Sequence, residues 1–201
     1  MGSYFNQISD IINAASSEAV FVASDFADIA EINTVRQCLS RLEQAGAIQR
    51  IMPGVYYQPV YSQLLGEYEA PSPRHVAAAL ARKFNWTIAP AGATALNQLG
   101  LSTQVPAQWT YISDGPYNSF SFGNTVLEFK HRNNKEIAGM SDMSALVIQA
   151  LKALGRDNVN NTIINKLQQI LSREQKLALL LETKHTTAWV YKNIKQICKE
   201  V

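Results

Sequence analysis

Cysteine and long apolar runs are both scarce in this sequence. Its two cysteines, Cys38 and Cys198, lie far apart in 201 residues, so we expect both to be reduced packing residues and not part of a disulfide framework. No apolar run approaches the roughly 20 residues that a membrane-spanning helix needs. The first residues also lack a basic stretch followed by an apolar one, the pattern of a secretory signal. We therefore expect a cytoplasmic protein with no membrane partner.

The residue patterns of catalytic and metal sites are also missing. The three histidines, His75, His131 and His185, are isolated in sequence and lack the spacing of four residues that places two ligands on one helix face. There is no nucleophile-elbow pattern and no glycine-rich phosphate loop, although the glycines around residues 92–100 permit either an anion site or a tight turn and a helix cap. We expect no metal, no cofactor and no enzymatic activity.

Lysine is absent before Lys83, and the charge is distributed unevenly. Residues 1–60 contain three arginines and six acidic residues, whereas residues 156–201 contain eight basic and four acidic residues. The net charge of +2 therefore does not by itself indicate a polyanionic partner. A case for nucleic acid has to come from local placement of basic and polar side chains.

The first 60 residues contain five short segments in an informative order. Apolar residues at spacings of three and four predict a helix over 4–15, and "VFVAS" predicts a strand, with Ser24 as the N-cap of a short helix over 25–30. Asn33 is the expected N-cap of a helix that ends near Gly46. The runs "AIQRI" and "VYYQP" around "MPG" predict a hairpin. This order predicts a winged helix-turn-helix domain over residues 1–62.

The remainder predicts an α+β fold. Residues 61–73 have the composition of a linker, and Ser72-Pro73 is a strong helix start, so the second domain is expected over 72–201. Strands are predicted for "WTIA" and residues 109–113, 118–122 and 125–132, with turns at 114–115 and 123–124, in a small, mainly antiparallel sheet. Helices are predicted for 74–84, 91–100 and several segments after 141, and Ser172 with Gln175 forms a capping box. These last helices form a C-terminal extension.

The helix that follows Asn33 has two different faces. Its apolar side chains recur with helical spacing and must face a core, while the opposite face carries amides, a hydroxyl and guanidinium groups. Such groups read base edges in the major groove, and a following hairpin can lie along the backbone or minor groove. The candidate DNA-binding residues are Asn33, Thr34, Arg36, Gln37, Ser40, Arg41, Gln44, Gln49 and Arg50.

Two alternatives remain open at this point. The polar helix can be an ordinary surface helix of a protein-interaction module, which the acidic N-terminal half favours, and an enzyme acting on nucleotides is a third reading. The helix that contains Lys192, Lys195 and Lys199 can be a second polyanion surface or a solvated cationic face over Val190 and Ile194.

Two segments resemble a known family. "LSRLEQAGAIQRIMPGVYYQP" resembles the winged-helix region of AbiEi-type antitoxins, the antitoxin half of type IV toxin–antitoxin pairs. "APAGATALNQLGLSTQVP", "WTYISDG" and "ALKALGRDNV" resemble the DUF6088 branch of that group. The resemblance spans roughly residues 5–160, and its most specific part is "ALNQLGLSTQVP".

The resemblance implies a cytoplasmic bacterial antitoxin that represses its own operon by binding double-stranded operator DNA. A homodimer would double the few basic contacts that one chain offers. It also implies functional antagonism of a cognate nucleotidyltransferase-like toxin through the C-terminal domain, without a stable complex. The sequence departs from the family pattern where Pro53 stands before the glycine of the hairpin and where "PYNSFSF" follows the Asp-Gly turn. Both departures remove positive charge.

Overall fold

The computed structural model describes residues 3–64, 66–132 and 139–199 and has an α+β fold. The chain divides into two compact units. One comprises the residues up to Trp86 together with Ser121–Asn124, and the other comprises Thr87–Phe120 and the residues from Thr125 onward. The division after Trp86 lies later than the predicted start of the second domain at residue 72. Helix α3 (Pro73–Phe84), which begins at Ser72-Pro73 as predicted, therefore belongs to the first unit.

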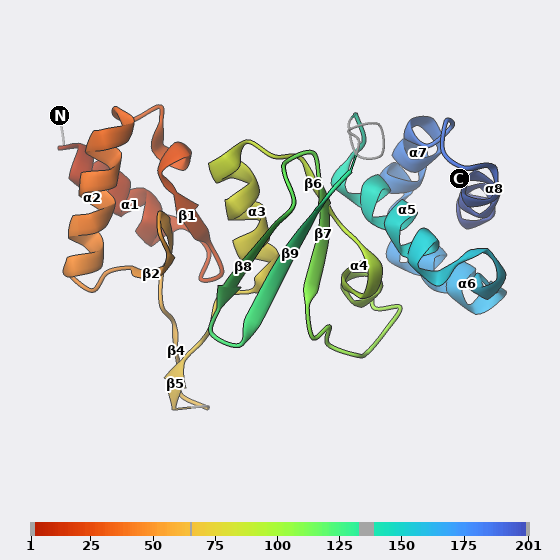
Figure 1. The fold of residues 1–201 in the computed structure, drawn as a ribbon, viewed down its shortest axis with the longest axis horizontal. Helices are drawn as coiled ribbons and strands as arrows, with labels where there is room; N and C mark the ends of the chain where they lie inside the picture. The colour runs from red at the N-terminus through yellow and green to blue at the C-terminus, as the bar shows by residue number, and fades with distance from the viewer. Residues whose placement is uncertain (1–2, 65, 133–138, 200–201) are drawn as a thin grey trace. The chain divides into compact units, whose positions relative to one another are not determined.

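The first unit contains the predicted segments in the predicted order (Figure 1). Helix α1 (Tyr4–Ala14) is followed by strand β1 (Val20–Val22), the 3-10 helix η1 (Ala23–Phe26), helix α2 (Ile32–Gln44) and strands β2 (Gln49–Met52) and β3 (Val55–Tyr57). The strands form an antiparallel sheet of order β1-β3-β2. Side chains of α1, η1 and α2 make its core with Phe21, Ile48 and Tyr56.

Two of the predicted helix starts are wrong. Ser24 does not cap a helix over 25–30, because it lies inside the single 3-10 turn η1, where the Asp25 carboxylate accepts a hydrogen bond from the Val22 amide at 2.9 Å. Asn33 is the second residue of α2, whose N-cap is Glu31. The predicted end of α2 is confirmed, because Gly46 has a φ of +76° and the Ala47 amide bonds to the Leu42 carbonyl.

The predicted linker contains regular structure. Strands β4 (Tyr61–Ser62) and β5 (Glu67–Tyr68) pair as a short antiparallel hairpin. The rings of Tyr61 and Tyr68 face each other edge to face, with centroids 5.4 Å apart. The contact between these cross-strand aromatic residues helps to hold the two-residue strands together.

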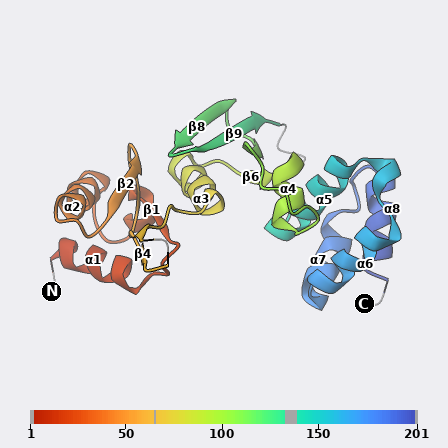
Figure 2. The same ribbon diagram turned by 90° about the horizontal axis from the view of Figure 1, so that it is seen from below.

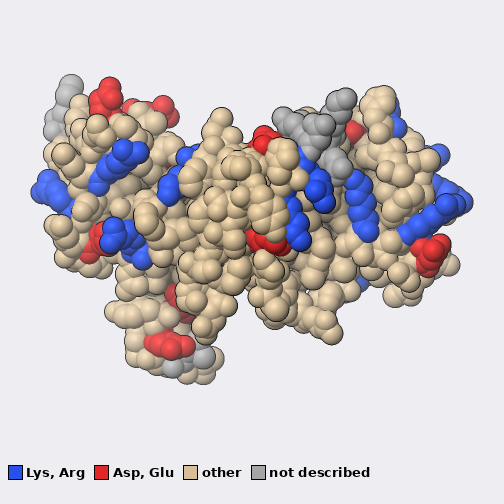
Figure 3. Space-filling view, viewed as in Figure 1, with Lys and Arg blue, Asp and Glu red and all other residues tan. Residues whose placement is uncertain are grey.

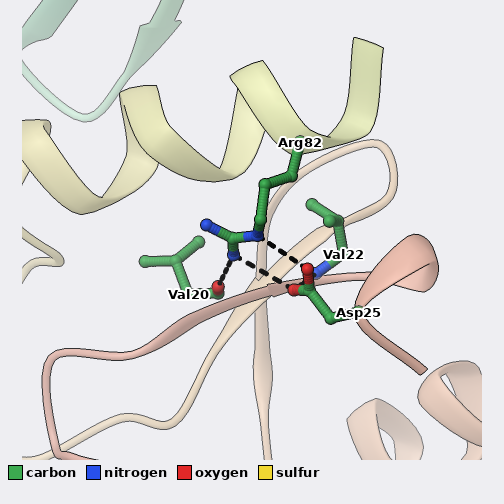
Figure 4. Close-up of polar contacts among 4 residues, drawn as sticks. All are labelled: Val20, Val22, Asp25 and Arg82. Carbon is green, nitrogen blue, oxygen red and sulfur yellow. Dashed lines mark hydrogen bonds and ion pairs between the residues drawn. The ribbon is translucent and has the colours of Figure 1, made fainter. Parts of the chain in front are cut away.

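Helix α3 packs on β1, η1 and β3, and one arginine fixes it there (Figure 4). The Arg82 guanidinium donates to both oxygens of Asp25, at 2.6 and 3.1 Å, and to the Val20 carbonyl at 2.8 Å. The same carboxylate holds the Val22 amide. Arg82 thus connects the end of α3 with both β1 and η1.

The second unit contains a sheet of order β6-β7-β9-β8, apart from the end of β8 and the turn after it, which are grouped with the first unit. Its strands are β6 (Ile88–Pro90), β7 (Trp109–Ser113), β8 (Asn118–Phe122) and β9 (Thr125–His131), and helix α4 (Gly92–Gln98) follows β6. β6 pairs antiparallel with β7, whereas β7 pairs parallel with β9. β9 therefore lies between β7 and β8, which the sequence pattern of consecutive strands did not predict. Tyr111 and Phe129 stack with ring centroids 5.7 Å apart.

Helices form the rest of this unit. They are α5 (Asp142–Leu154), the 3-10 helix η3 (Arg156–Asn158), α6 (Asn161–Ile170), α7 (Arg173–Glu182) and α8 (Ala188–Ile197). Figure 2 shows α6, α7 and α8 grouped beside α5, and their apolar faces share one core with α4. The predicted capping box at Ser172 and Gln175 is confirmed by reciprocal bonds of 2.9 and 3.2 Å. Across the described parts of the chain, no helix is long and apolar enough to span a membrane.

Candidate nucleic-acid interface

Helix α2 presents the predicted polar face to solvent. Its apolar stripe, Val35, Cys38, Leu39 and Leu42, is buried against the core of the first unit. On the other face Asn33, Arg36, Gln37, Arg41 and Gln44 are exposed, and Thr34 and Ser40 are half-buried. Gln49 and Arg50, at the start of β2, are also exposed. The nine candidate residues therefore lie on two consecutive elements of one unit, and none is fully buried.

Contacts within the unit orient several of these side chains. The Arg41 guanidinium carbon lies 4.6 Å from the centroid of the Phe5 ring on α1. Arg36 donates to the Asn33 side-chain oxygen at 3.4 Å. No carboxylate among the described residues lies within ion-pair distance of Arg36 or Arg41. Both guanidinium groups therefore keep their positive charge uncompensated.

The two candidates on β2 already have partners. The Arg50 guanidinium lies 3.3 Å from the Glu43 carboxylate, which partly offsets its charge. The Gln49 side-chain oxygen accepts a hydrogen bond of 2.8 Å from the Tyr57 hydroxyl. Of the predicted set, the side chains on α2 are therefore better placed for a new ligand than those on β2.

The turn of the β2–β3 hairpin is Met52-Pro53-Gly54-Val55. The ring of Pro53 fixes φ at the second position of the turn. Gly54, at the third position, adopts a φ of +73°, which a glycine reaches without strain. The turn has no basic residue of its own, but the Lys83 ammonium from α3 donates to the Pro53 carbonyl. Lys83 therefore places a positive charge at the turn, and sequence reasoning missed it because it is 30 residues away from Pro53.

A pocket of about 460 Å³ lies beside this turn. Its lining includes Arg36 and Ile32 from α2, Ser24 from η1, Pro53 from the turn and Lys83 from α3. The pKa of Lys83 is lowered below its usual value, first by burial and then by the positive charge of Arg36. Arg36 and Lys83 are thus two like charges on the lining of one pocket.

Comparison with known proteins identifies the family of this chain. The model described as "Family of unknown function (DUF6088)" matches residues 7–179, which is most of the chain. The chain belongs to the DUF6088 family. A search of curated proteins found no match. The chain is also similar to the crystal structure of the RV2827C protein from Mycobacterium tuberculosis, at 11% identity and a TM-score of 0.40, over 99% of this chain and 77% of that one.

On the face drawn in Figure 3, the basic side chains of this DUF6088 chain are dispersed and do not form one continuous surface. In the part of Figure 3 that belongs to the first unit, uncharged residues separate several Lys and Arg side chains, and acidic groups lie nearby. Helix α3 contributes Arg74, Arg82 and Lys83, as many basic residues as the whole of residues 1–60. With α3 included, the first unit has six basic and eight acidic residues, a net charge of −2 against −3 for the predicted domain.

The second cationic face of the DUF6088 chain lies on and just beyond α8. Lys192, Lys195 and Lys199 are exposed, while Val190 and Ile194 are buried on the opposite side. The Lys195 ammonium lies 5.3 Å from the centroid of the Tyr191 ring. This arrangement fits a solvated amphipathic helix. Elsewhere, no group of three His, Cys, Asp or Glu residues in the described segments could hold a metal ion.

Proposed function

We propose that the first unit is a winged helix-turn-helix that binds double-stranded DNA, with α2 in the major groove. The observation that carries this proposal is the outward face of α2, where amides and two uncompensated guanidinium groups are exposed beside the hairpin turn. Arg36, Gln37, Ser40 and Arg41 would meet base edges, because amides bond to adenine and guanidinium groups to guanine in that groove. The hairpin would contact the backbone.

We further propose that the protein is a cytoplasmic antitoxin that represses its own type IV toxin–antitoxin operon and opposes a nucleotidyltransferase-like toxin. This proposal rests on the resemblance of "LSRLEQAGAIQRIMPGVYYQP" and "ALNQLGLSTQVP" to AbiEi-type antitoxins, together with membership of DUF6088. Each chain has few basic side chains for DNA contacts, so a homodimer on two half-sites would double the number of contacts.

A gel-shift titration with the intergenic DNA upstream of the gene tests the DNA-binding proposal. We expect a salt-sensitive shift that Gln37→Ala and the double variant Arg36→Ala with Arg41→Ala weaken, by about 1–3 kcal/mol for each side chain that no longer bonds to a base. Arg173→Ala, which removes an exposed charge from α7 in the other unit, is the control and should bind like the wild type. No shift, or equal shifts for all proteins, would reject DNA binding through α2.

The β4–β5 hairpin favours a second function, in which this unit binds a protein. Leu64 at its tip is 94% exposed, and Tyr61 and Tyr68 are exposed beside it. Three exposed apolar side chains on one short hairpin are typical of a surface that another protein covers. A pull-down with the product of the adjacent gene separates the two functions. Retention that Leu64→Ser abolishes, without a DNA shift, would support the protein-binding function.

A further inference from the structure

The pocket beside the β2–β3 turn brings two cations together without an anion. Arg36 from α2 and Lys83 from α3 both line it, and neither has a carboxylate partner among the residues that the structure describes. Like charges that face each other destabilise the empty pocket. A pair of this kind is typical of a site completed by an anionic ligand.

We propose that this pocket binds one backbone phosphate of the DNA, held between the Lys83 ammonium and the Arg36 guanidinium, so that Arg36 contacts the backbone while Gln37, Ser40 and Arg41 are left to meet the base edges. This inference rests on the proposed DNA binding and adds to it a phosphate site with a ligand from α3, a helix outside the predicted domain of residues 1–62. Lys83 is a phosphate ligand that no part of the helix-turn-helix pattern would identify.

The geometry around Lys83 is suited to this role. Its ammonium donates one hydrogen bond to the Pro53 carbonyl, and a Cβ on Gly54 would lie 3.5 Å from the same nitrogen, so the ammonium lies directly against the turn. An ammonium group has three N–H donors, and the Lys83 nitrogen also lies 5.0 Å from the centroid of the Phe84 ring, which leaves a donor for a phosphate oxygen. The bond to the turn thus fixes the position of the charge before any ligand arrives.

The position of the pocket identifies the phosphate as one of duplex DNA. Arg36 lies on the exposed face of α2, one residue before Gln37, and also lines the pocket. A duplex whose major groove holds α2 carries its backbone past the first turn of that helix. Leu39 is buried in the wall of the pocket, while Arg36 and Lys83 are exposed, so a phosphate can reach both cations from solvent.

The test is the salt dependence of DNA binding by the full chain and its Lys83→Met variant. One neutralised phosphate contributes about 0.9 to the slope of log affinity against log salt, so we expect the variant to lose about 0.9 of slope and roughly five- to tenfold in affinity near 0.1 M salt. The loss should be equal for operator and unrelated DNA, because a phosphate contact is independent of sequence. Lys83→Arg should retain most of the affinity.

Arg74→Met is the matched control, since it removes an exposed positive charge from the same helix. It should leave the slope of log affinity against log salt unchanged. Thermal unfolding of each variant checks that it is folded. A neutral methylphosphonate placed at the contacted position should weaken the wild type more than Lys83→Met, which retains only the Arg36 contact to that phosphate. If the wild type binds DNA and Lys83→Met matches it in slope and affinity, the phosphate site is wrong while the proposed function stands. If the wild type binds no DNA, both are wrong.

Discussion

At the scale of single residues, Arg82 makes the most connected polar contact of the first unit. Its guanidinium bonds to Asp25 and to the Val20 carbonyl, and Asp25 in turn holds the Val22 amide. We expect Arg82→Met to lower the free energy of unfolding by about 1–2 kcal/mol, because it removes the charge-assisted hydrogen bonds of a partly exposed pair. Urea unfolding followed by circular dichroism measures this change.

A double-mutant cycle that combines Arg82→Met with Asp25→Asn separates the interaction between these two side chains from their other contacts. We expect a coupling energy on the order of 1 kcal/mol between Arg82 and Asp25, because the two side chains contact each other directly. Arg74→Met, at the other end of α3, serves as the control and should show no coupling with Asp25→Asn. A coupling energy near zero for Arg82 would mean that apolar packing alone holds α3 to β1.

The candidate residues on α2 could be predicted from sequence, whereas Lys83 could not. The helical period fixes which side of α2 is buried, so the exposure of Arg36 and Gln37 follows from the positions of Val35 and Leu39. Lys83 reaches the turn only through the packing of α3 on the sheet of the first unit. No local pattern records that packing, because it joins residues 30 apart in the chain.

At the scale of elements, sequence patterns predicted most helices and strands but not every start. The segment after β1 has the composition of a helix, yet it makes only the single 3-10 turn η1. The parallel pairing of β7 with β9 is also invisible in sequence. The presence of a strand follows from the local alternation of apolar and polar residues, while the order of strands in the sheet depends on contacts between distant segments.

The N-terminus of α5 depends on an acidic residue from another helix. The Glu182 carboxylate, at the end of α7, accepts bonds from the Ser141 amide at 2.9 Å and the Ser141 hydroxyl at 2.8 Å. Burial alone would raise the pKa of Glu182, but hydrogen bonds from Ser144 and Ser141 outweigh it and lower the pKa below 4.5. The negative charge also lies at the positive end of the α5 dipole.

Glu182→Gln should therefore destabilise the second unit in a pH-dependent manner. A carboxylate whose folded pKa is lowered contributes stability above its unfolded pKa, near 4.5, and loses that contribution as the pH falls through the folded value. We expect a loss on the order of 1 kcal/mol at pH 7 that shrinks below pH 4.5. Chemical unfolding at a series of pH values measures it. Glu69→Gln, an exposed change in the other unit, is the control, and a pH-independent loss would contradict this role of the charge.

At the scale of the whole molecule, composition and periodicity predicted an α+β chain divided near residue 72, whereas the contacts in the structure group α3 with the first unit. Ser72-Pro73 is a correct helix start, and a helix start after a proline-containing segment is a reasonable position for a domain boundary. The apolar face of α3, with Val76, Ala79 and Leu80 fully buried, belongs to the first unit. The helical spacing of its apolar residues shows that this face of α3 is buried, but it does not show which element covers the face.

The two boundaries predict different behaviour for truncated chains. A fragment of residues 1–86 keeps α3 and its Arg82 contacts, so we expect it to unfold cooperatively. A fragment of residues 1–72 exposes the surface that α3 covers on β1 and η1 and should be less stable by several kcal/mol, because apolar burial contributes about 25 cal/mol per Å². Thermal unfolding of both fragments, with Arg82→Met in the longer one as an intermediate case, measures the difference. Equal stability of the two fragments would mean that α3 is dispensable for folding of the first unit, and that the boundary near residue 72 is the physical one.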